Sequence, residues 1–158
     1  MSSDANTIQI TSPAFSAGQP IPAEYTCKGA NRSPALNWSG VPTGTRSLTL
    51  LVEDPDAPSG TFTHWVLANI PPTTGGLEAG LPDTTRMLGS AIQGPNDGGR
   101  TGYMGPCPPT GKPHRYIFTL YAVDQVLDLK GTLSKAAVLA ALKGHILANG
   151  QLMGTFQR

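Results

Sequence analysis

The sequence has little charge and no cluster of positive charge. Only 13% of its 158 residues are charged, about half of the usual share, and the formal net charge is +1. Binding to a nucleic-acid backbone needs several clustered lysines and arginines, so nucleic acid is not an expected partner. Any site for an anion must therefore be built locally, from a few side chains and backbone N–H groups.

Long apolar runs are also missing. No run approaches the roughly 18 residues that a membrane-spanning helix needs. The start of the chain, Met1–Asn6, has neither the basic nor the apolar stretch of a secretory signal. We therefore expect no membrane span and a cytoplasmic location.

Cysteine is scarce, with only Cys27 and Cys107. Cytoplasmic thiols are normally kept reduced, so we expect two free thiols and no structural disulfide. The sequence alone leaves open whether the two residues lie close in space.

Glycine and proline, in contrast, are abundant, with 19 and 15 residues spread through the chain without a period. Such a composition is typical of many short strands joined by turns. The apolar runs between these residues predict the following strands. They are Ile8–Ile10, Ser47–Glu53, Thr61–Ile70, Leu88–Gln93, Arg115–Val123 and Gln151–Phe156.

One helix is expected, from Ser134 to Ala148. Ser134 can cap its first turn, and Val138, Leu142 and Ile146 form an apolar stripe at four-residue spacing. The Asn-Gly pair that follows is a common helix stop. We therefore predict a mainly β fold for a single domain of residues 1–158: an antiparallel two-sheet sandwich with one helix in its C-terminal region.

The strand Thr61–Ile70 carries a histidine among apolar residues. Alternation places His64 on one face with Val66, and Trp65 on the other face with Leu67. Both faces are largely apolar, as expected of a central strand that is covered on both sides.

The segment Gly94–Pro113 fits no regular element, because six of its 20 residues are glycine and five are proline. A loop of this length inside a compact domain is usually functional or disordered. Its prolines and Tyr103 favour an ordered, stiff loop.

Three polar clusters lie at or near strand ends. Asp54–Pro58 (DPDAP) directly follows a strand, His64 lies in the next strand, and His114–Tyr116 (HRY) follows the long loop. Alternation places His114 and Tyr116 on one face of their strand, with Arg115 on the other.

Together these clusters could form a hollow rich in hydrogen-bond donors. Two imidazoles and a tyrosine hydroxyl suit a phosphate, sulfate or carboxylate oxygen, and Asp54 could fix a histidine tautomer. Gly105 would bring backbone N–H groups close to the ligand. Apolar walls from Pro58, Trp65 and Pro108 would limit the site to one small head group.

Each cluster taken alone has a simpler structural interpretation. A single histidine such as His64 is more often a satisfied core residue, and Asp54–Pro58 is a good turn sequence. Tyr116 alone is ordinary strand filling. Only the combination favours a binding site.

The combination resembles the phosphatidylethanolamine-binding protein family, also called the Raf kinase inhibitor protein family. The resemblance covers nearly the whole chain and is strongest to the compact bacterial and archaeal branch. Four motifs carry it: Asp54–Pro58, His64-Trp65, Gly102–Pro109 (GYMGPCPP) and Gly111–Tyr116 (GKPHRY).

The resemblance implies a two-sheet β-fold with a small anion pocket. Cys107 falls where the family often has a loop glycine whose backbone N–H faces the ligand. Asp56 is expected to hold the loop rather than the ligand, and Pro58 and Pro108 fall on wall positions. The ligand-binding residues that the motifs imply are Asp54, His64, Cys107, His114 and Tyr116.

The expected function is a binding and regulatory module without catalytic residues, metal or cofactor. Its ligand would be phosphate, a carboxylate or a phospholipid head group. A kinase or a protease is a candidate protein partner, and a homodimer formed through sandwich edges stays open.

Three alternatives stay open. A metal-dependent hydrolase could use His64, His114 and Asp54, although their spacing matches no compact metal motif. A cysteine nucleophile could pair Cys107 with His114, although the flanking prolines cannot furnish oxyanion donors. A kinase or protease inhibitor could act through an exposed loop, with the pocket secondary.

Overall fold

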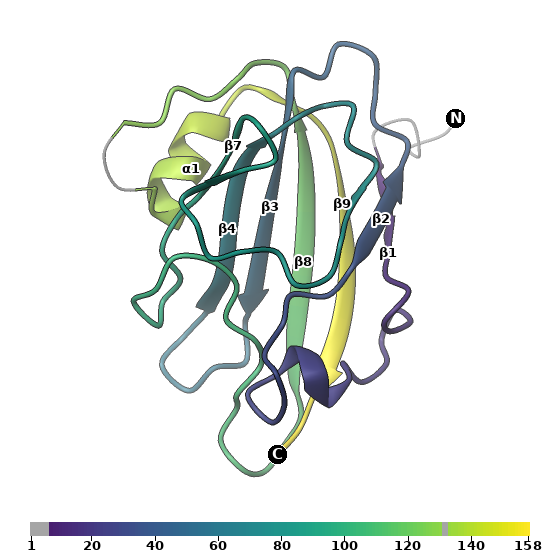
Figure 1. Cartoon of the computed structure of the whole chain (residues 1–158), viewed down its shortest axis with the longest axis vertical. Coiled ribbons are helices and arrows are strands. Elements are labelled where there is room, and N and C mark those ends of the chain that lie inside the picture. The colour runs from purple at the N-terminus through teal and green to yellow at the C-terminus, as the bar shows by residue number, and fades with distance from the viewer. Residues whose placement is uncertain (1–6, 131–132) are drawn as a thin grey trace.

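Two antiparallel sheets and one α-helix make up the computed structural model, which describes residues 7–130 and 133–158 (Figure 1). The smaller sheet has the strand order β1-β2-β5, and the larger has the order β6-β7-β4-β3-β8-β9. The predicted fold class, a two-sheet antiparallel β architecture with one helix, is confirmed. The elements are β1 (Gln9–Thr11), the 3-10 helix η2 (Ala23–Tyr25), β2 (Leu36–Ser39), β3 (Ser47–Asp54), β4 (Phe62–Ile70), β5 (Gly76–Leu77), β6 (Arg86–Met87), β7 (Ala91–Gln93), β8 (His114–Val123), α1 (Lys135–Leu142) and β9 (Ile146–Phe156).

Each face of the larger sheet is covered by its own apolar cluster. Leu36 of the smaller sheet packs between the sheets with Leu50 of β3 and Phe118 of β8, and none of the three is exposed. On the opposite face, Val138 of α1 belongs to a second cluster with Leu51 of β3. β3 and β8 are thus central strands buried from both sides, which explains their near-continuous apolar sequence.

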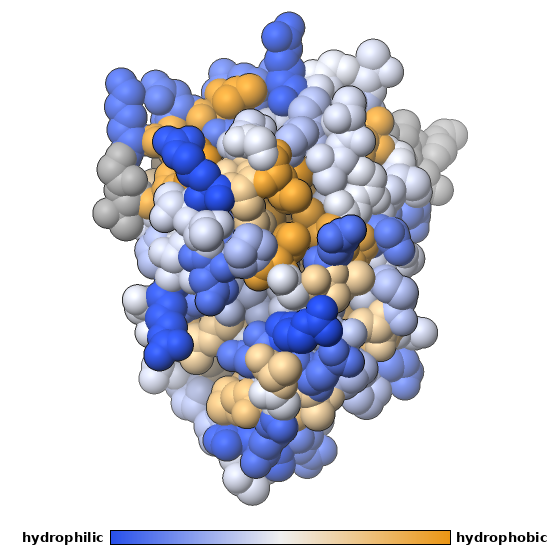
Figure 2. Space-filling model, in the orientation of Figure 1, coloured by the Kyte–Doolittle hydropathy of each residue, from blue (hydrophilic) through white to orange (hydrophobic). Residues whose placement is uncertain are grey.

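The ends of β3 and β8 that carry the polar clusters lie at the lower end of the molecule in Figure 1. In the same view, the strongly apolar side chains that reach the surface gather in the upper half, and the lower end is mainly hydrophilic (Figure 2). The polar clusters thus lie away from the apolar surface seen from this side.

Two β-bulges interrupt the pairing of β3 with β4, and the first lies at a candidate site residue. Val52 and Glu53 are adjacent in β3, but they pair with Trp65 and Thr63, so His64 is an extra residue in β4. A bulge can re-aim a side chain relative to the regular alternation. Trp65 packs in the cluster between the sheets, and the His64 ring lies against a tyrosine of that cluster. The expectation that His64 and Trp65 face opposite sides is therefore wrong.

The second bulge lies between Leu48 and Leu50 of β3. In β4 it falls at Asn69, which has a φ of 56°. The Asn69 side chain donates to the backbone oxygen of Leu127 at 2.9 Å and accepts from its N–H at 2.8 Å. This bulge therefore anchors the segment that leads to α1.

The helix is shorter than the sequence pattern predicts. It begins as expected, with the Ser134 hydroxyl accepting from the N–H of Ala137 at 3.1 Å, but it ends at Leu142. Gly144 follows with a φ of 83°, which turns the chain into β9 from Ile146 onward. No helix in the described ranges is long and apolar enough to cross a membrane.

The Asn-Gly pair that was expected to stop the helix lies inside β9. An added Cβ at Gly150 would lie 2.0 Å from the backbone oxygen of Ile8, so glycine is required by a close backbone approach. The N-terminal segment runs along the outer edge of β9. The N–H groups of Ile8, Gly18 and Ile21 donate to β9 carbonyl oxygens at 2.7–2.8 Å.

Shorter strands also depart from the expectation. The strand predicted over Leu88–Gln93 is limited to β7, because Leu88 and Gly89 both have positive φ and form a turn. β2, β5 and β6 are not predicted from the sequence. They have two to four residues each, too few for an alternating pattern to show.

Candidate functional site

A cavity of about 140 Å³ lies where the C-terminal end of β3 and the N-terminal ends of β4 and β8 meet the long loop. Its polar lining comes from Asp54, His64, His114 and Tyr116. These four residues come from three strands that are adjacent in the larger sheet. The convergence predicted from the sequence is therefore present, and the ligand-binding role of the residues stays a prediction.

His114 is held by a buried carboxylate. Its Nδ1 lies 2.7 Å from Oδ2 of Asp54, whose side chain is only 4% exposed. The other oxygen of Asp54 accepts from the N–H of Asp56 at 2.8 Å. Because a carboxylate only accepts, the proton of the His114 ring is fixed at Nδ1, and Nε2 remains for a ligand.

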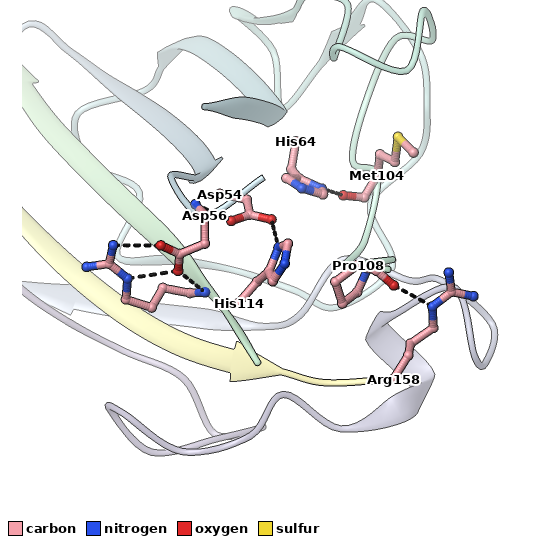
Figure 3. A network of polar contacts seen from close by, with 8 residues as sticks. Asp54, Asp56, His64, Met104, Pro108, His114 and Arg158 are labelled. Carbon is pink, nitrogen blue, oxygen red and sulfur yellow. Dashed lines mark hydrogen bonds and ion pairs between the residues drawn. The ribbon is translucent and has the colours of Figure 1, made fainter. Parts of the chain in front are cut away.

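His64 is held in the same manner by a backbone carbonyl (Figure 3). Its Nδ1 donates to the oxygen of Met104 at 2.5 Å, and the Met104 N–H donates back to the His64 oxygen at 3.0 Å. Burial lowers the pKa of His64, and the Met104 hydrogen bond and the charge of Asp54 oppose this only in part. The ring is therefore neutral near pH 7, with its proton on Nδ1 and a bare acceptor at Nε2.

Tyr116 supplies a hydroxyl that no neighbour satisfies. The residue is 1% exposed, and within the described ranges its hydroxyl has no hydrogen-bond partner. Its ring lies edge-on to His64, with centroids 5.2 Å apart. Burial raises its pKa, and the nearby Asp54 carboxylate raises it further through its charge and as an acceptor for the hydroxyl, so the hydroxyl keeps its proton. The Asp54 contact does not reach hydrogen-bond geometry, and a buried donor without an acceptor is costly, which points to a partner that binds from the cavity.

Pro58, Cys107 and Pro108 line the cavity as the resemblance implies. Phe62 and Met104 line it as well, and sequence reasoning misses both. Phe62 begins β4 two residues before His64, and the two rings lie 4.8 Å apart. The Met104 contribution is a backbone carbonyl, whose direction no side-chain pattern reveals.

Three predicted support residues do not line the cavity. Trp65 was expected as an apolar wall, but it packs against Tyr103 and donates from Nε1 to Gln93 at 2.6 Å. Its indole therefore supports the inner side of the long loop. Gly105 and Asp56 instead make hydrogen bonds that hold loops in place.

Asp56 binds Arg115 through both carboxylate oxygens. Oδ2 accepts from the Arg115 N–H and Nε at 2.9 Å each, and Oδ1 accepts from Arg115 at 2.8 Å. The arginine hydrogen bond lowers the pKa of Asp56 to about 2. This clamp joins the turn after β3 to the start of β8, and thus fixes Asp54 relative to His114.

Gly105 brings the long loop against the segment that follows η2. Its N–H donates to Asn31 Oδ1 at 2.9 Å, and an added Cβ would lie 2.3 Å from that oxygen. Two residues earlier, the Tyr103 hydroxyl donates to the backbone oxygen of Tyr25 at 2.7 Å. The loop is therefore ordered by contacts, and the Gly105 N–H does not serve the cavity.

A disulfide joins the same two segments and corrects the expectation of free thiols. Cys27 and Cys107 are bonded, with their Cα atoms 5.4 Å apart and a sequence separation of 80. The N–H of Cys27 also donates to the oxygen of Pro106 at 3.1 Å. At the other side of the loop, Arg158 Nε donates to the oxygen of Pro108 at 2.5 Å (Figure 3). With Cys107 bonded, the alternative of a cysteine nucleophile has no thiol to act.

The metal alternative is not supported by the donor geometry. Among the described residues, no group of three or more histidine, cysteine, aspartate or glutamate side chains is placed to hold a metal ion. One oxygen of Asp54 is taken by His114, and Nδ1 of His64 is taken by Met104.

The sequence matches a known protein family over most of its length. The family described as phosphatidylethanolamine-binding protein matches residues 11–157. The chain belongs to the phosphatidylethanolamine-binding protein family. The resemblance inferred from the four motifs is thus confirmed.

Relatives within the family include archaeal and bacterial proteins. A protein of Methanothermobacter thermautotrophicus, named UPF0098 protein, is 52% identical over 145 residues, which cover 92% of this chain and 95% of the relative. A protein of Chlamydia muridarum with the same name is 43% identical over 156 residues, covering 96% of this chain and 99% of the relative.

Two solved structures share the family fold. A putative phosphatidylethanolamine-binding protein homologue from Chlamydia trachomatis has a TM-score of 0.88 and 42% identity, covering 97% of this chain and 99% of that chain. Escherichia coli YbcL, described as a member of the mammalian family, also has a TM-score of 0.88, with 35% identity, covering 96% and 98% of the two chains.

Proposed function

We propose that this phosphatidylethanolamine-binding protein family member is a binding module for a small oxyanion, such as a phosphate monoester, a sulfate or a carboxylate. The observation that carries the proposal is the Tyr116 hydroxyl, a buried donor without an acceptor in the described ranges that lies beside the cavity. An oxyanion would accept from this hydroxyl, and one that carries its own proton would also donate to the open Nε2 of His114.

The charges in the cavity determine how an anion is held. The described lining of the cavity contains the Asp54 carboxylate, which lies 2.7 Å from Nδ1 of His114, and no lysine or arginine. His64, which lines the cavity, is neutral because burial lowers its pKa, and its Nε2 is left as an acceptor. An anion is therefore held well only if a proton comes with it, either on the ligand itself or taken up by His64.

The size of the cavity limits the ligand to a head group. Its volume of about 140 Å³ is well below the roughly 300–1,000 Å³ of typical sites for larger ligands. Apart from the four polar residues, its walls are mainly apolar, with Pro58, Phe62 and Pro108 among them. A charged group with a short apolar substituent fits this combination.

A calorimetric titration with sulfate tests the proposal. Saturable binding is expected, and Tyr116→Phe should weaken it about tenfold, since one hydrogen bond to a charged group contributes about 1.5 kcal/mol. Tyr121→Phe is the matched control, because Tyr121 lies on the same strand but packs against the helix-side cluster. Absence of saturable binding, or equal affinities for both variants, would rule out this site.

A further inference from the structure

We propose that the Cys27–Cys107 disulfide is a covalent modification site, at which a small anionic thiol enters the cavity and forms a mixed disulfide with Cys107. The proposal deepens the proposed anion site and rests on it. It assigns the site a second class of ligand, a thiol that carries a carboxylate, and a means by which that ligand closes the cavity to other anions.

Both cysteines of the disulfide are exposed residues, whereas the neighbouring Thr26 and Pro108 are buried. Exposed disulfides are typically the labile or regulatory ones, whereas structural disulfides are shielded from attacking thiols. This bond therefore differs from a shielded structural disulfide in its exposure, which determines how readily thiols react with it.

The cavity determines which sulfur is attacked. Cys107 lines the cavity and Cys27 does not. A thiolate attacks a disulfide along the line of the two sulfurs, and the far sulfur leaves. A thiolate that arrives through the cavity meets Cys107, and Cys27, which does not line the cavity, becomes the leaving group.

The polar lining selects thiols by charge. Tyr116, whose hydroxyl has no acceptor in the described ranges, lines the same cavity as Cys107. A carboxylate two or three bonds from the thiol sulfur can accept from this hydroxyl while the sulfur approaches Cys107. A thiol that carries an ammonium group cannot accept from Tyr116 and meets only the bare Nε2 of His64, because both Asp54 oxygens already accept from His114 and the Asp56 N–H.

The loop is expected to keep its place after the bond opens. Tyr103 still donates to Tyr25, and Gly105 still donates to Asn31, at 2.7 and 2.9 Å. Neither hydrogen bond involves a sulfur atom. The adduct on Cys107 therefore stays in the cavity and occupies the anion site.

The exchange needs no reactant other than the thiol. In the first step the thiolate bonds to the Cys107 sulfur, the bond between the cysteines breaks, and its electron pair leaves on Cys27, which takes a proton from water. A second thiolate then attacks the ligand sulfur of the mixed disulfide and releases Cys107 as a thiolate. In total, two thiols are oxidised to one disulfide and the protein disulfide is reduced to two thiols.

The test compares mercaptoacetate, 2-mercaptoethanol and cysteamine, which are anionic, neutral and cationic, at equal thiolate concentration. Samples of the intact protein are quenched with acid, alkylated and analysed by peptide mass spectrometry. Mercaptoacetate is expected to form its adduct on Cys107 about tenfold faster than cysteamine, the ratio that one charge-assisted hydrogen bond provides. Saturating sulfate should remove this advantage.

Two variants separate selection by charge from simple exposure. Tyr116→Phe should reduce the preference for mercaptoacetate, and Tyr121→Phe should preserve it. An adduct found on Cys27, or equal rates for the three thiols, would overturn the proposal.

Calorimetry distinguishes this failure from failure of the anion site. If sulfate binds but does not slow mercaptoacetate, only the exchange proposal is wrong. If sulfate does not bind and the three thiols react equally, both proposals are wrong.

Discussion

Sulfate affinity is expected to rise as the pH falls, because the cavity needs a proton to hold an anion. The perturbation is a change of pH at constant ionic strength, with sulfate as the ligand. Sulfate itself carries no proton between about pH 5 and pH 8, the range in which histidine titrates. Any proton that accompanies binding is then taken up by the protein.

The magnitude follows from the number of protons taken up. A negative charge beside His64 raises the pKa of this imidazole in the complex above its lowered value in the free protein. The gain in affinity is complete below the pKa of the free protein and is lost as the pH rises through the pKa of the complex. Between these two values, each proton taken up changes the dissociation constant about tenfold per pH unit, or about 1.4 kcal/mol.

Calorimetry in two buffers with different ionisation enthalpies measures this proton uptake directly. NMR identifies the residue, because the chain has only three histidines. The pKa of His64 should rise on saturation with sulfate. His145 is the internal control, since it is a half-buried residue outside the cavity, paired with Asp124 at 2.8 Å. His64→Gln should flatten the pH dependence by about one proton.

One outcome would refute the reasoning. If sulfate binds with an affinity that does not change with pH, and no proton is taken up in either buffer, the neutral state assigned to His64 is wrong. An unchanged proton count in His64→Gln would instead assign the uptake to another group.

Three further predictions concern how the site is held. Gly105→Ala should lower the free energy of unfolding by about 1–3 kcal/mol in urea denaturation, because the added Cβ meets backbone and side-chain oxygens at 2.3 Å. Gly75→Ala is the control and should leave the free energy of unfolding unchanged, because its Cβ meets nothing within 4 Å. The pKa of Asp56 is lowered from 3.8 to about 2 in the folded state, so its ionised form stabilises the wild type above about pH 4, and this stability is lost as the pH falls through about 2. Asp56→Asn should lack this pH-dependent part of the stability. Urea midpoints that fall equally with pH in both proteins would contradict this. Replacing both Cys27 and Cys107 by serine should cost about 4 kcal/mol of stability in the same assay, since the bond closes a loop of 80 residues, and an unchanged midpoint would count against it.

The long central strands and the meeting of the polar clusters could be predicted from the sequence. β3, β4 and β8 are strongly apolar, and their polar residues occur where the apolar runs stop. In an antiparallel arrangement, the end of β3 and the beginnings of β4 and β8 lie at the same end of the sheet. The convergence of Asp54 with His114 follows from that geometry.

The face assignments within β4 could not be predicted, because they depend on two bulges. Alternation assumes an unbroken pleat, and the extra residue at His64 breaks it beside the site. Nothing in the residue types around His64 shows where the partner strand lacks a residue.

Gly144 is a local signal for the end of the helix, but the apolar stripe that continues to Ile146 favours a longer helix. Gly144 can adopt the positive φ that ends a helix, and it precedes Ile146 by two residues. Gly150, in contrast, is explained only by the approach of Ile8, which is distant in sequence. The cysteine pairing could not be predicted, because thiols stay reduced in the expected compartment and the sequence does not show the distance between Cys27 and Cys107.

The N-terminal segment that runs along β9 has a consequence for self-association. Strand β9 is long and ends the larger sheet, and such an edge would offer a template for a second copy of the chain. Ile8, Gly18 and Ile21 already donate to its carbonyl oxygens. A second copy could extend the sheet there only by displacing these three donors, so a dimer that leaves the fold intact would have to join through another surface.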